Sequence, residues 1–440
     1  MQKHFRFLLI QSARGLYASS GGYKANIHLA EGLVKSGYTV KMVANVWASD
    51  LKNFTYTTEK LELNQLTSPS TSLQVYRFYF KNMEVVGFDL ADCQRVFTSE
   101  FQQRRIRWLG EEEEFPDMEN YRKFLLNEYA KFHPTHVIFN ESTSLKIFSD
   151  LKGVVKVFIC HACEHLSFGP YAGYPNFGTS KSDIETQRLR KVDGLWVVSK
   201  CIQKYIADYS GIEATYMPIH PLTYGAQPFP VYNNFNHGLV TAINPGSVKG
   251  FHIFLDLAKS LPHVTFGAVK SWSLLPNQVD ILSAQKNIRI LETFRDMDNL
   301  WRKTKILLVP SVWCEAFGLI VVEAMLRGIP VLASNIGGLP EAKCGITEGL
   351  IPVKILTGER SNDPEYIKNW GVYLIPEQNV DPWVESVTEL INDPVKYQRV
   401  RKDGIEAAYQ YLNSIDVNIY ERWLTELYLK RADLDNSVNS

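Results

Sequence analysis

The sequence predicts an α/β protein made of two doubly wound domains that face one another. Short apolar runs typical of buried parallel strands alternate with segments of helical periodicity along most of the 440 residues. One Pro-, Asn- and Gly-rich stretch at 219–237 interrupts this alternation and indicates a linker. The chain is also too long for one ordinary hydrophobic core. We therefore expect domains over 1–218 and 238–412, joined by that linker, and a last helix over 413–432 that crosses back to the first domain.

In the first half, FRFLLIQ (Phe5–Gln11) has the short apolar pattern of a buried strand. A loop follows it, and KANIHLAEGLVKSG then places apolar residues at helical spacing before the strand YTVKMVAN (Tyr38–Asn45). In a parallel sheet such a strand–helix–strand unit forms a right-handed crossover. Further strands are expected at THVIFNE, VVKVFIC and DGLWVVS, and further helices at NYRKFLLNEYAKF and KCIQKYIADYSG.

In the second half the alternation restarts after the linker. The segments GLVTAIN, VTFGAV, IRIL, KILLVP and IPVLAS have the composition of buried strands, and HIFLDLAKSL and DNLWRKT that of the helices between them. Two such runs of strand and helix predict two separate doubly wound sheets, each of which binds ligands at the carboxyl ends of its strands.

Charge and composition exclude several classes of protein. Lys plus Arg and Asp plus Glu balance at 47 each, so no global field attracts nucleic acid or an anionic membrane. The apolar run near the N-terminus is only FLLI, and no segment reaches 18 uninterrupted apolar residues. We expect a cytoplasmic protein without an integral membrane segment.

The six cysteines are scattered, and free thiols are the default expectation. The segment CHACEH gathers Cys160, His161, Cys163 and His165, but no second pair of similar spacing follows, as a structural zinc site requires. We therefore expect no metal and no other cofactor.

The segment SVWCEAFGLIVVEAM (Ser311–Met325) places two carboxylates eight residues apart. Glu315 follows a predicted strand, Glu323 lies on the helix that comes next, and Gly318 and Leu319 offer free N–H groups at the start of that helix. An anion at the helix terminus with a carboxylate on either side suits a nucleotide sugar, whose hydroxyls flank its diphosphate. The alternative is that both glutamates are ordinary residues, one favoured by the helix dipole and one on the helix surface.

The longer segment PSVWCEAFGLIVVEAMLRGIPVLASNIGGLPE (310–341) resembles the retaining GT-B glycosyltransferases of family 4 over its full length. Pro-Ser, Glu-x7-Glu around Phe-Gly, Glu-Ala-Met, Gly-x-Pro-Val and Gly-Gly-x-x-Glu all occur in order. The resemblance implies a GT-B fold, two Rossmann-like domains around a central cleft, with the donor in the second. It implies that Glu315 contacts the donor hexose and Glu323 the ribose, and that Phe317, Gly318 and Leu319 present backbone to the sugar and phosphate.

Two other segments fit the same resemblance. GSVKGF is similar to the family's Lys-Gly element, which implies that Lys249 holds the diphosphate. Many members carry an Arg about five residues earlier, where this chain has Asn244-Pro245. SSGGYKANIHLAEGL resembles the Gly-Gly loop after the first strand, where Gly21 and Gly22 admit a close backbone approach.

Three further residues are candidates at strand ends. Family members often carry a His where His161 follows VVKVFIC, and it could orient a substrate hydroxyl, although a buried structural histidine is the alternative. Thr293 and Phe294, after IRIL, are expected to contact the donor base.

Together these residues predict a metal-independent, retaining transfer of a hexose, most simply from UDP, to a hydroxyl of a soluble sugar or small molecule. The catalytic set is expected to be His161, Lys249 and Glu315. A GT-B nucleotide-sugar epimerase and a non-catalytic nucleotide-sugar-binding protein are the alternatives, while a Rossmann dehydrogenase is disfavoured because no GxGxxG opens the first unit. The oligomeric state stays open.

Overall fold

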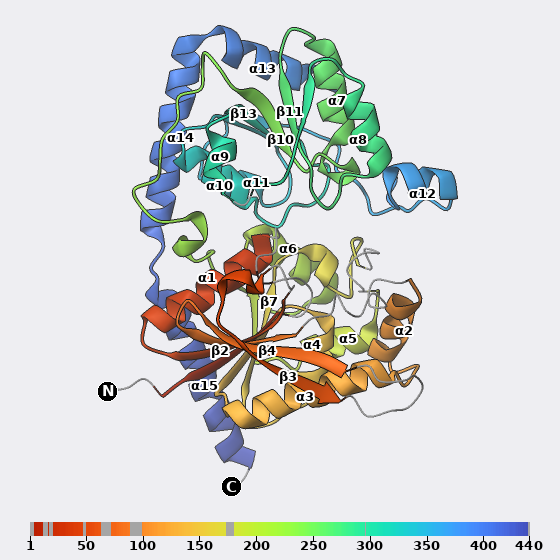
Figure 1. The fold of residues 1–440 in the computed structure, drawn as a ribbon, viewed down its shortest axis with the longest axis vertical. Coiled ribbons are helices and arrows are strands. Elements are labelled where there is room, and N and C mark those ends of the chain that lie inside the picture. The colour runs from red at the N-terminus through yellow and green to blue at the C-terminus, as the bar shows by residue number, and fades with distance from the viewer. Residues whose placement is uncertain are drawn as a thin grey trace. The chain divides into compact units, whose positions relative to one another are not determined.

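The computed structural model describes residues 4–11, 16, 21–46, 50–62, 72–88, 99–172, 180–294 and 296–438. It divides the chain into two compact units (Figure 1). Unit 1 contains Met1–Thr223 and Asp416–Ser440, and unit 2 contains Tyr224–Ile415. The chain passes from unit 1 to unit 2 within the stretch 219–237 and returns within 413–432.

Unit 1 is built on a nine-stranded sheet in the order β3-β4-β5-β2-β1-β6-β7-β8-β9. The part from β5 to β9 is parallel, and its central strands are almost entirely buried, as expected of a sheet covered on both faces. The strands are β1 (Arg6–Gln11), β2 (Thr39–Asn45), β3 (Thr57–Glu62), β4 (Ser72–Phe80), β5 (Met83–Phe88), β6 (His136–Phe139), β7 (Val155–Cys160), β8 (Gly194–Val197) and β9 (Thr215–Tyr216).

The helices of unit 1 place their apolar stripes against this sheet. Helix α1 buries Ile27, Leu29, Ala30 and Leu33, four of the five apolar residues whose helical spacing predicted it, while the fifth, Val34, is half-buried. The helices are α1 (Gly21–Lys35), α2 (Ser99–Leu109), α3 (Pro116–Phe132), α4 (Ser142–Phe148), α5 (Asp183–Leu189), α6 (Lys200–Ser210) and α15 (Asn418–Val438).

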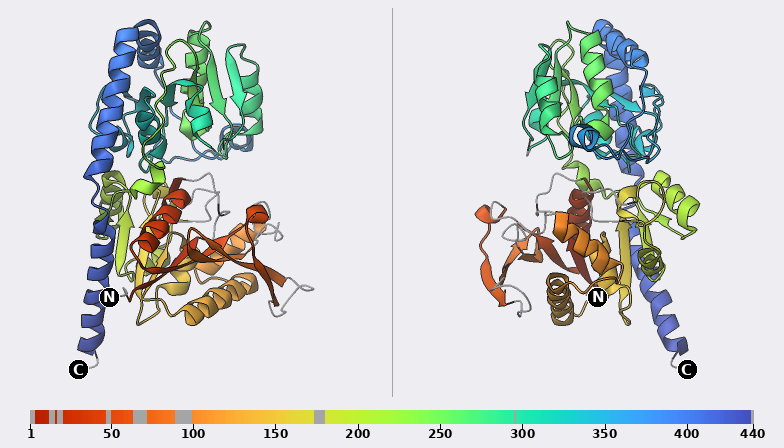
Figure 2. Two further views of the ribbon diagram at one scale, coloured as in Figure 1. Left: turned by 60° about the vertical axis from the view of Figure 1, so that its left-hand side comes forward. Right: turned by 90° about the vertical axis from the view of Figure 1, so that its right-hand side faces the viewer.

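The antiparallel strands at one edge of unit 1 are a feature that the alternation of strands and helices did not predict (Figure 2). Strand β4 pairs antiparallel with both β3 and β5, and β5 then joins the parallel part beside β2. The β4–β5 turn consists of Lys81 and Asn82, at φ 51° and 62°. Two successive left-handed residues match the twist of the flanking strands, which makes this the favoured type of two-residue hairpin turn.

Unit 2 has a six-stranded, wholly parallel sheet in the order β12-β11-β10-β13-β14-β15. Counted within the unit, this is the order 3-2-1-4-5-6 of a doubly wound dinucleotide-binding sheet, and the order reverses between β10 and β13. The strands are β10 (Leu239–Ile243), β11 (Phe266–Val269), β12 (Ile288–Leu291), β13 (Thr304–Val309), β14 (Val331–Ser334) and β15 (Leu350–Ile351).

Helices flank this sheet as well (Figure 1). They are α7 (Phe251–Ser260), α8 (Pro276–Ser283), α9 (Asp298–Trp301), α10 (Leu319–Leu326), α11 (Leu339–Ala342), α12 (Pro364–Trp370), α13 (Asp381–Asn392) and α14 (Pro394–Ser414). The long helix α14 covers α10, and Gly404 of α14 lies beside the side chain of Met325.

Helix α15 belongs to unit 1 although it ends the chain, and it runs along the sheet of that unit (Figure 2). Its aromatic face is buried: Tyr420 stacks on Trp196 of β8 with ring centroids 5.4 Å apart, and Trp423 lies over Gly194. The helix begins at Asn418 rather than 413, because α14 continues to Ser414 and the Asp416 carboxylate accepts a hydrogen bond from the Asn418 N–H at 2.9 Å.

None of the helices in the described part of the chain is both long enough and apolar enough to cross a membrane.

Candidate active site

The two strands that flank the switch point of unit 2 bring Lys249 and Glu315 together. Lys249 ends a short 3-10 turn (Ser247–Lys249) after β10, and Glu315 lies in the loop after β13. The Lys249 Nζ lies 2.6 Å from the Glu315 Oε1, and the two side chains are only 20% and 16% exposed. Parallel strands end at a common edge, so this pair occupies the place where doubly wound sheets bind ligands. The structure thus joins two residues, 66 positions apart, that the sequence predicted separately.

The same carboxylate oxygen accepts a second hydrogen bond, at 2.5 Å, from the hydroxyl of Ser311. The backbone around it is also fixed, since the Gly338 N–H donates to the Glu315 carbonyl at 2.7 Å. A Cβ on Gly338 would lie 2.4 Å from the Ala316 carbonyl oxygen, and one on Gly337 would lie 2.6 Å from that of Glu315. The Gly-Gly pair therefore allows one loop to lie directly on the other.

Helix α10 begins just beyond this carboxylate. Its first turn follows Gly318, which has φ 102° and no side chain to cap the helix, so the helix start presents backbone N–H groups and a partial positive charge. Phe317 is 2% exposed and its ring stacks on Tyr411 at 6.0 Å. Its side chain therefore anchors the loop in the core of unit 2, which leaves its backbone for the role that the resemblance implies.

Glu323 lies on the second turn of α10 and is 5% exposed. The helix is short and almost wholly buried, from Val321 to Leu326, so its glutamate is not on a surface face. This excludes the alternative of a solvated helix residue. A buried carboxylate requires polar partners, whether from the protein or from a ligand.

Asn244, which lies where the sequence resemblance implies an Arg, supports a neighbouring turn. It has φ 58°, its Oδ1 accepts a hydrogen bond from the Ser273 N–H at 3.0 Å, and its carbonyl accepts one from the Ser273 hydroxyl at 3.3 Å. Asparagine tolerates the left-handed region better than most residues. Its side chain is thus committed in part to backbone geometry, and Lys249 is the cation beside Glu315.

Thr293 and Phe294 follow β12, two strands away from β10. The Thr293 hydroxyl donates to the Lys270 carbonyl at 2.8 Å, and the Phe294 ring lies 5.7 Å from the Lys303 Nζ. Contact of these two residues with a donor base stays a prediction.

In unit 1, Gly21 and Gly22 are the first two residues of α1 rather than part of a loop. The preceding residues 12–15 and 17–20 of the predicted loop lie outside the described residues. Gly22 faces the imidazole of His161, because a Cβ on Gly22 would lie 2.8 Å from the His161 Cγ. The structure therefore explains this glycine by contact with a residue that the sequence selected independently.

His161 follows β7 at the carboxyl edge of the unit 1 sheet and is half-buried. Its Nε2 lies 2.7 Å from the Asn26 Oδ1, and the Asn26 Nδ2 donates to the Gln11 Oε1 at 3.4 Å. Burial, with a smaller contribution from His165, lowers the pKa of His161 to about 3, so the imidazole is neutral at physiological pH.

Sequence reasoning missed Gln11 and Asn26. Asn26 was visible as a polar residue inside the apolar stripe of the predicted helix, between Ala25 and Ile27, and such a residue usually has a specific partner. Gln11, the last residue of β1, had no comparable signal.

Cys160 and Cys344 have free thiols, and burial raises the pKa of the Cys160 thiol to about 12. Within the described part of the chain, no three His, Cys, Asp or Glu side chains gather in a group that could hold a metal ion.

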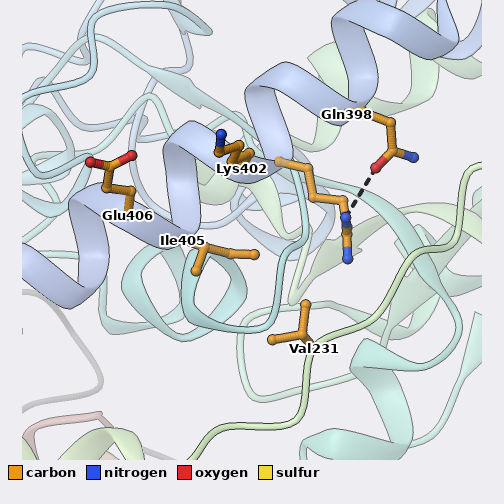
Figure 3. A pocket seen from close by; sticks show the side chains of 6 residues that line it. Val231, Gln398, Lys402, Ile405 and Glu406 are labelled. Atoms are coloured by element: carbon orange, nitrogen blue, oxygen red, sulfur yellow. Dashed lines mark hydrogen bonds between the residues drawn. The ribbon is translucent and has the colours of Figure 1, made fainter.

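A surface pocket of about 570 Å³ lies elsewhere in unit 2, between α14 and the segment around Val231 (Figure 3). None of the predicted site residues contributes to its lining, which consists of Val231, Gln398, Arg401, Lys402, Ile405 and Glu406.

The segment that contains the predicted donor-site residues of unit 2 is similar to known proteins. Residues 246–350, which contain Lys249, Glu315 and Glu323, match the family model described as "Glycosyl transferases group 1". The chain is 33% identical over 115 residues to the D-inositol 3-phosphate glycosyltransferase of Mycobacterium sp. (strain KMS), which covers 24% of this chain and 26% of that protein. The chain spans about half the length, or less, of the curated relatives it matches.

Among solved structures, sucrose-phosphate synthase from Thermosynechococcus elongatus is similar with a TM-score of 0.65 and 14% identity, covering 99% of both chains. The pneumococcal O-GlcNAc transferase, solved with UDP and GlcNAc, is similar with a TM-score of 0.57 and 13% identity, covering 97% of this chain and 99% of that one. At these identities the likeness establishes the fold.

The mainly parallel sheet of unit 1, the parallel sheet of unit 2 and this likeness define the GT-B fold, as the sequence resemblance predicted. Within this fold, residues 246–350, which contain the donor-site segment, match the model of the group 1 glycosyltransferases.

Proposed function

We propose that this protein transfers a hexose from a UDP-sugar to a hydroxyl of a soluble sugar or small molecule, with retention of configuration and without a metal ion. Unit 2 would bind the donor and unit 1 would supply the residues that contact the acceptor. The donor base, the sugar and the acceptor are parts of this proposal.

The observation that carries the proposal is the convergence of Lys249 and Ser311 on Glu315 at the switch point of unit 2, beside the uncapped start of α10. A diphosphate fits there because a lysine ammonium and a helix N-terminus both favour an anion. Such preorganised positive charge stabilises the leaving nucleoside diphosphate, which is the role a metal ion fills elsewhere.

The ion pair also prepares both of its members for binding. The Lys249 ammonium has three donors and uses one on Glu315, which leaves two for phosphate oxygens. The Glu315 carboxylate is held by two donors on one oxygen, so its other oxygen remains as an acceptor for hexose hydroxyls. Little side-chain freedom is then lost when the donor binds.

His161 fits a binding role rather than a proton-donating one. A pKa of about 3 makes the imidazole neutral, and a neutral ring nitrogen accepts a hydrogen bond from a hydroxyl. The leaving diphosphate would itself receive the proton of the acceptor hydroxyl. This is the front-face mechanism that the resemblance to retaining enzymes implies.

The test is a product assay with nucleotide sugars labelled at the anomeric carbon, run with a panel of monosaccharides and small alcohols. NMR of the products should show the donor's anomeric configuration, and Glu315→Gln should abolish turnover. An inverted product would contradict retention, and release of an epimerised nucleotide sugar would establish the epimerase alternative. Tight nucleotide binding without turnover in any mixture would indicate the non-catalytic alternative.

A further inference from the structure

We propose that Asn26 is a positioning residue that holds His161 as the tautomer protonated on Nε2, so that Nδ1 presents a lone pair to a substrate hydroxyl. The role of that lone pair rests on the proposed function. The tautomer is a property of the free protein and is tested independently of transfer.

The Asn26 amide has two partners, Gln11 and His161. Asn26 is 2% exposed and Gln11 is fully buried, so neither side chain turns toward water. The Nδ2 of Asn26 faces the Gln11 Oε1 at 3.4 Å, which turns the Asn26 Oδ1 toward the His161 Nε2 at 2.7 Å. Because a carbonyl oxygen carries no hydrogen, the proton in this short contact belongs to His161 Nε2.

The other ring nitrogen of His161, Nδ1, carries no proton in this tautomer. A neutral imidazole has one N–H, and burial keeps this ring neutral across the physiological range. With the proton on Nε2, Nδ1 is an acceptor only. Among the described residues no hydrogen-bond partner is found for Nδ1.

Helix α1 also restricts the position of the His161 imidazole. Gly22 and Asn26 are four residues apart and therefore lie on one face of the helix. Gly22 allows the ring to approach within 2.8 Å of where a Cβ would be, and Asn26 binds its Nε2 one turn later. One face of helix α1 thus determines both how closely the imidazole approaches the helix and which of its nitrogens carries the proton.

The chemical consequence is selectivity for a hydrogen-bond donor at Nδ1. A sugar or small-molecule hydroxyl can donate to the lone pair, whereas a carbonyl or phosphate oxygen cannot pair with it. In the opposite tautomer Nδ1 would carry the proton and would require a hydrogen-bond acceptor instead of a donor. Asn26 thereby acts on substrate choice without touching substrate.

The test is long-range ¹H–¹⁵N NMR of the full-length protein labelled in its histidines, with the His161 signals assigned by their loss in His161→Gln. The wild type should show Nε2–H with an unprotonated Nδ1. Asn26→Asp keeps an acceptor oxygen, and its carboxylate raises the pKa of the imidazole, so it should keep this tautomer at a pH above that raised value. Asn26→Ala should give a mixture of the two tautomers. His136 is an internal control for folding, because its Nε2 lies 3.0 Å from the Leu424 carbonyl and its Nδ1 2.9 Å from the Thr135 hydroxyl.

Activity supplies the second readout. Asn26→Ala should lower kcat by about tenfold, the loss of one hydrogen bond, with Asn26→Asp close to wild type and UDP affinity unchanged in both. An Nδ1–H tautomer in the wild type, or an unchanged tautomer in a folded Asn26→Ala, would overturn the inference whatever the activity. The Nε2–H tautomer in a protein that transfers no sugar would leave the positioning intact and remove the proposed function instead.

Discussion

Removing the charge of Lys249 should weaken UDP binding far more than it weakens the fold. The ammonium makes a charge-assisted hydrogen bond to Glu315 and, in the proposed complex, to phosphate. Such bonds contribute about 1.5–3 kcal/mol, so Lys249→Met should raise the Kd for UDP by about 10- to 150-fold. Its cost in unfolding free energy should be only about 1 kcal/mol, because Ser311 still donates to Glu315 and both members of the pair are partly exposed.

A double-mutant cycle isolates the pair itself. Lys249→Met, Glu315→Gln and the double variant are compared by denaturant unfolding, and UDP affinity is measured by calorimetry at one fixed salt concentration. We expect a coupling energy of about 1 kcal/mol in stability. The control is Lys259→Met with Asp256→Asn, since that exposed pair at 3.2 Å should couple by less than about 0.5 kcal/mol.

Two results would refute the reasoning. If Lys249→Met binds UDP as tightly as the wild type, the ammonium does not hold the diphosphate. If the coupling energy of Lys249 and Glu315 does not exceed that of the surface control pair, the contact between these two side chains does not stabilise the site.

Two further predictions concern the scaffold. Gly338→Ala should lower the free energy of unfolding by roughly 1–3 kcal/mol and reduce UDP affinity, because its Cβ would lie 2.4 Å from the Ala316 carbonyl oxygen. The control is Gly404→Ala in α14, where the nearest neighbour of the new Cβ is 3.6 Å away, and it should raise the free energy of unfolding by about 0.5–1 kcal/mol. Equal effects of the two variants in denaturant unfolding would contradict this. Burial lowers the pKa of His136 to about 4, so the unfolded chain binds an extra proton at this site between about pH 6.5 and 4. This histidine therefore contributes a fall in stability of about 1.4 kcal/mol per pH unit as pH decreases through that window, in addition to the contributions of other histidines whose pKa is lowered, such as His161. His136→Gln should reduce the slope of unfolding free energy against pH by about 1.4 kcal/mol per pH unit in that window, and an unchanged slope would exclude this histidine as one of its sources.

The alternation of strands and helices was sufficient to predict the sheet of unit 2 and the parallel part of the sheet of unit 1, because a strand buried on two faces has a distinct composition. The carboxyl-edge positions of Glu315, Lys249 and His161 followed from the same pattern, since each comes directly after a predicted strand. Strand order did not follow from it. That β10 and β13 are neighbours, and so bring Lys249 to Glu315, depends on pairing between segments far apart in sequence.

The parts that were missed depend on tertiary contacts or on local turn chemistry. The β4–β5 hairpin turns at Lys81 and Asn82, which lack the glycine that usually marks such a turn. Gly22 was placed in a loop because its segment resembles the family's Gly-Gly loop after the first strand, but its close contact with His161 accounts for it at the helix start. The burial of Glu323 results from α10 being covered on nearly all sides, which no local period reveals.

The most direct test of the central claim, a nucleotide diphosphate site at the switch point of unit 2, is hydrogen–deuterium exchange with UDP, GDP and ADP in turn. At about 100 times its Kd, the correct nucleotide should stabilise its site by roughly 2.7 kcal/mol. We expect that one of the three nucleotides slows exchange in residues 246–250 and in residues 315–320 at the same time, and that Lys249→Met shows no such protection. Protection confined to other segments, such as the α14 pocket, or none with any of the three, would contradict it.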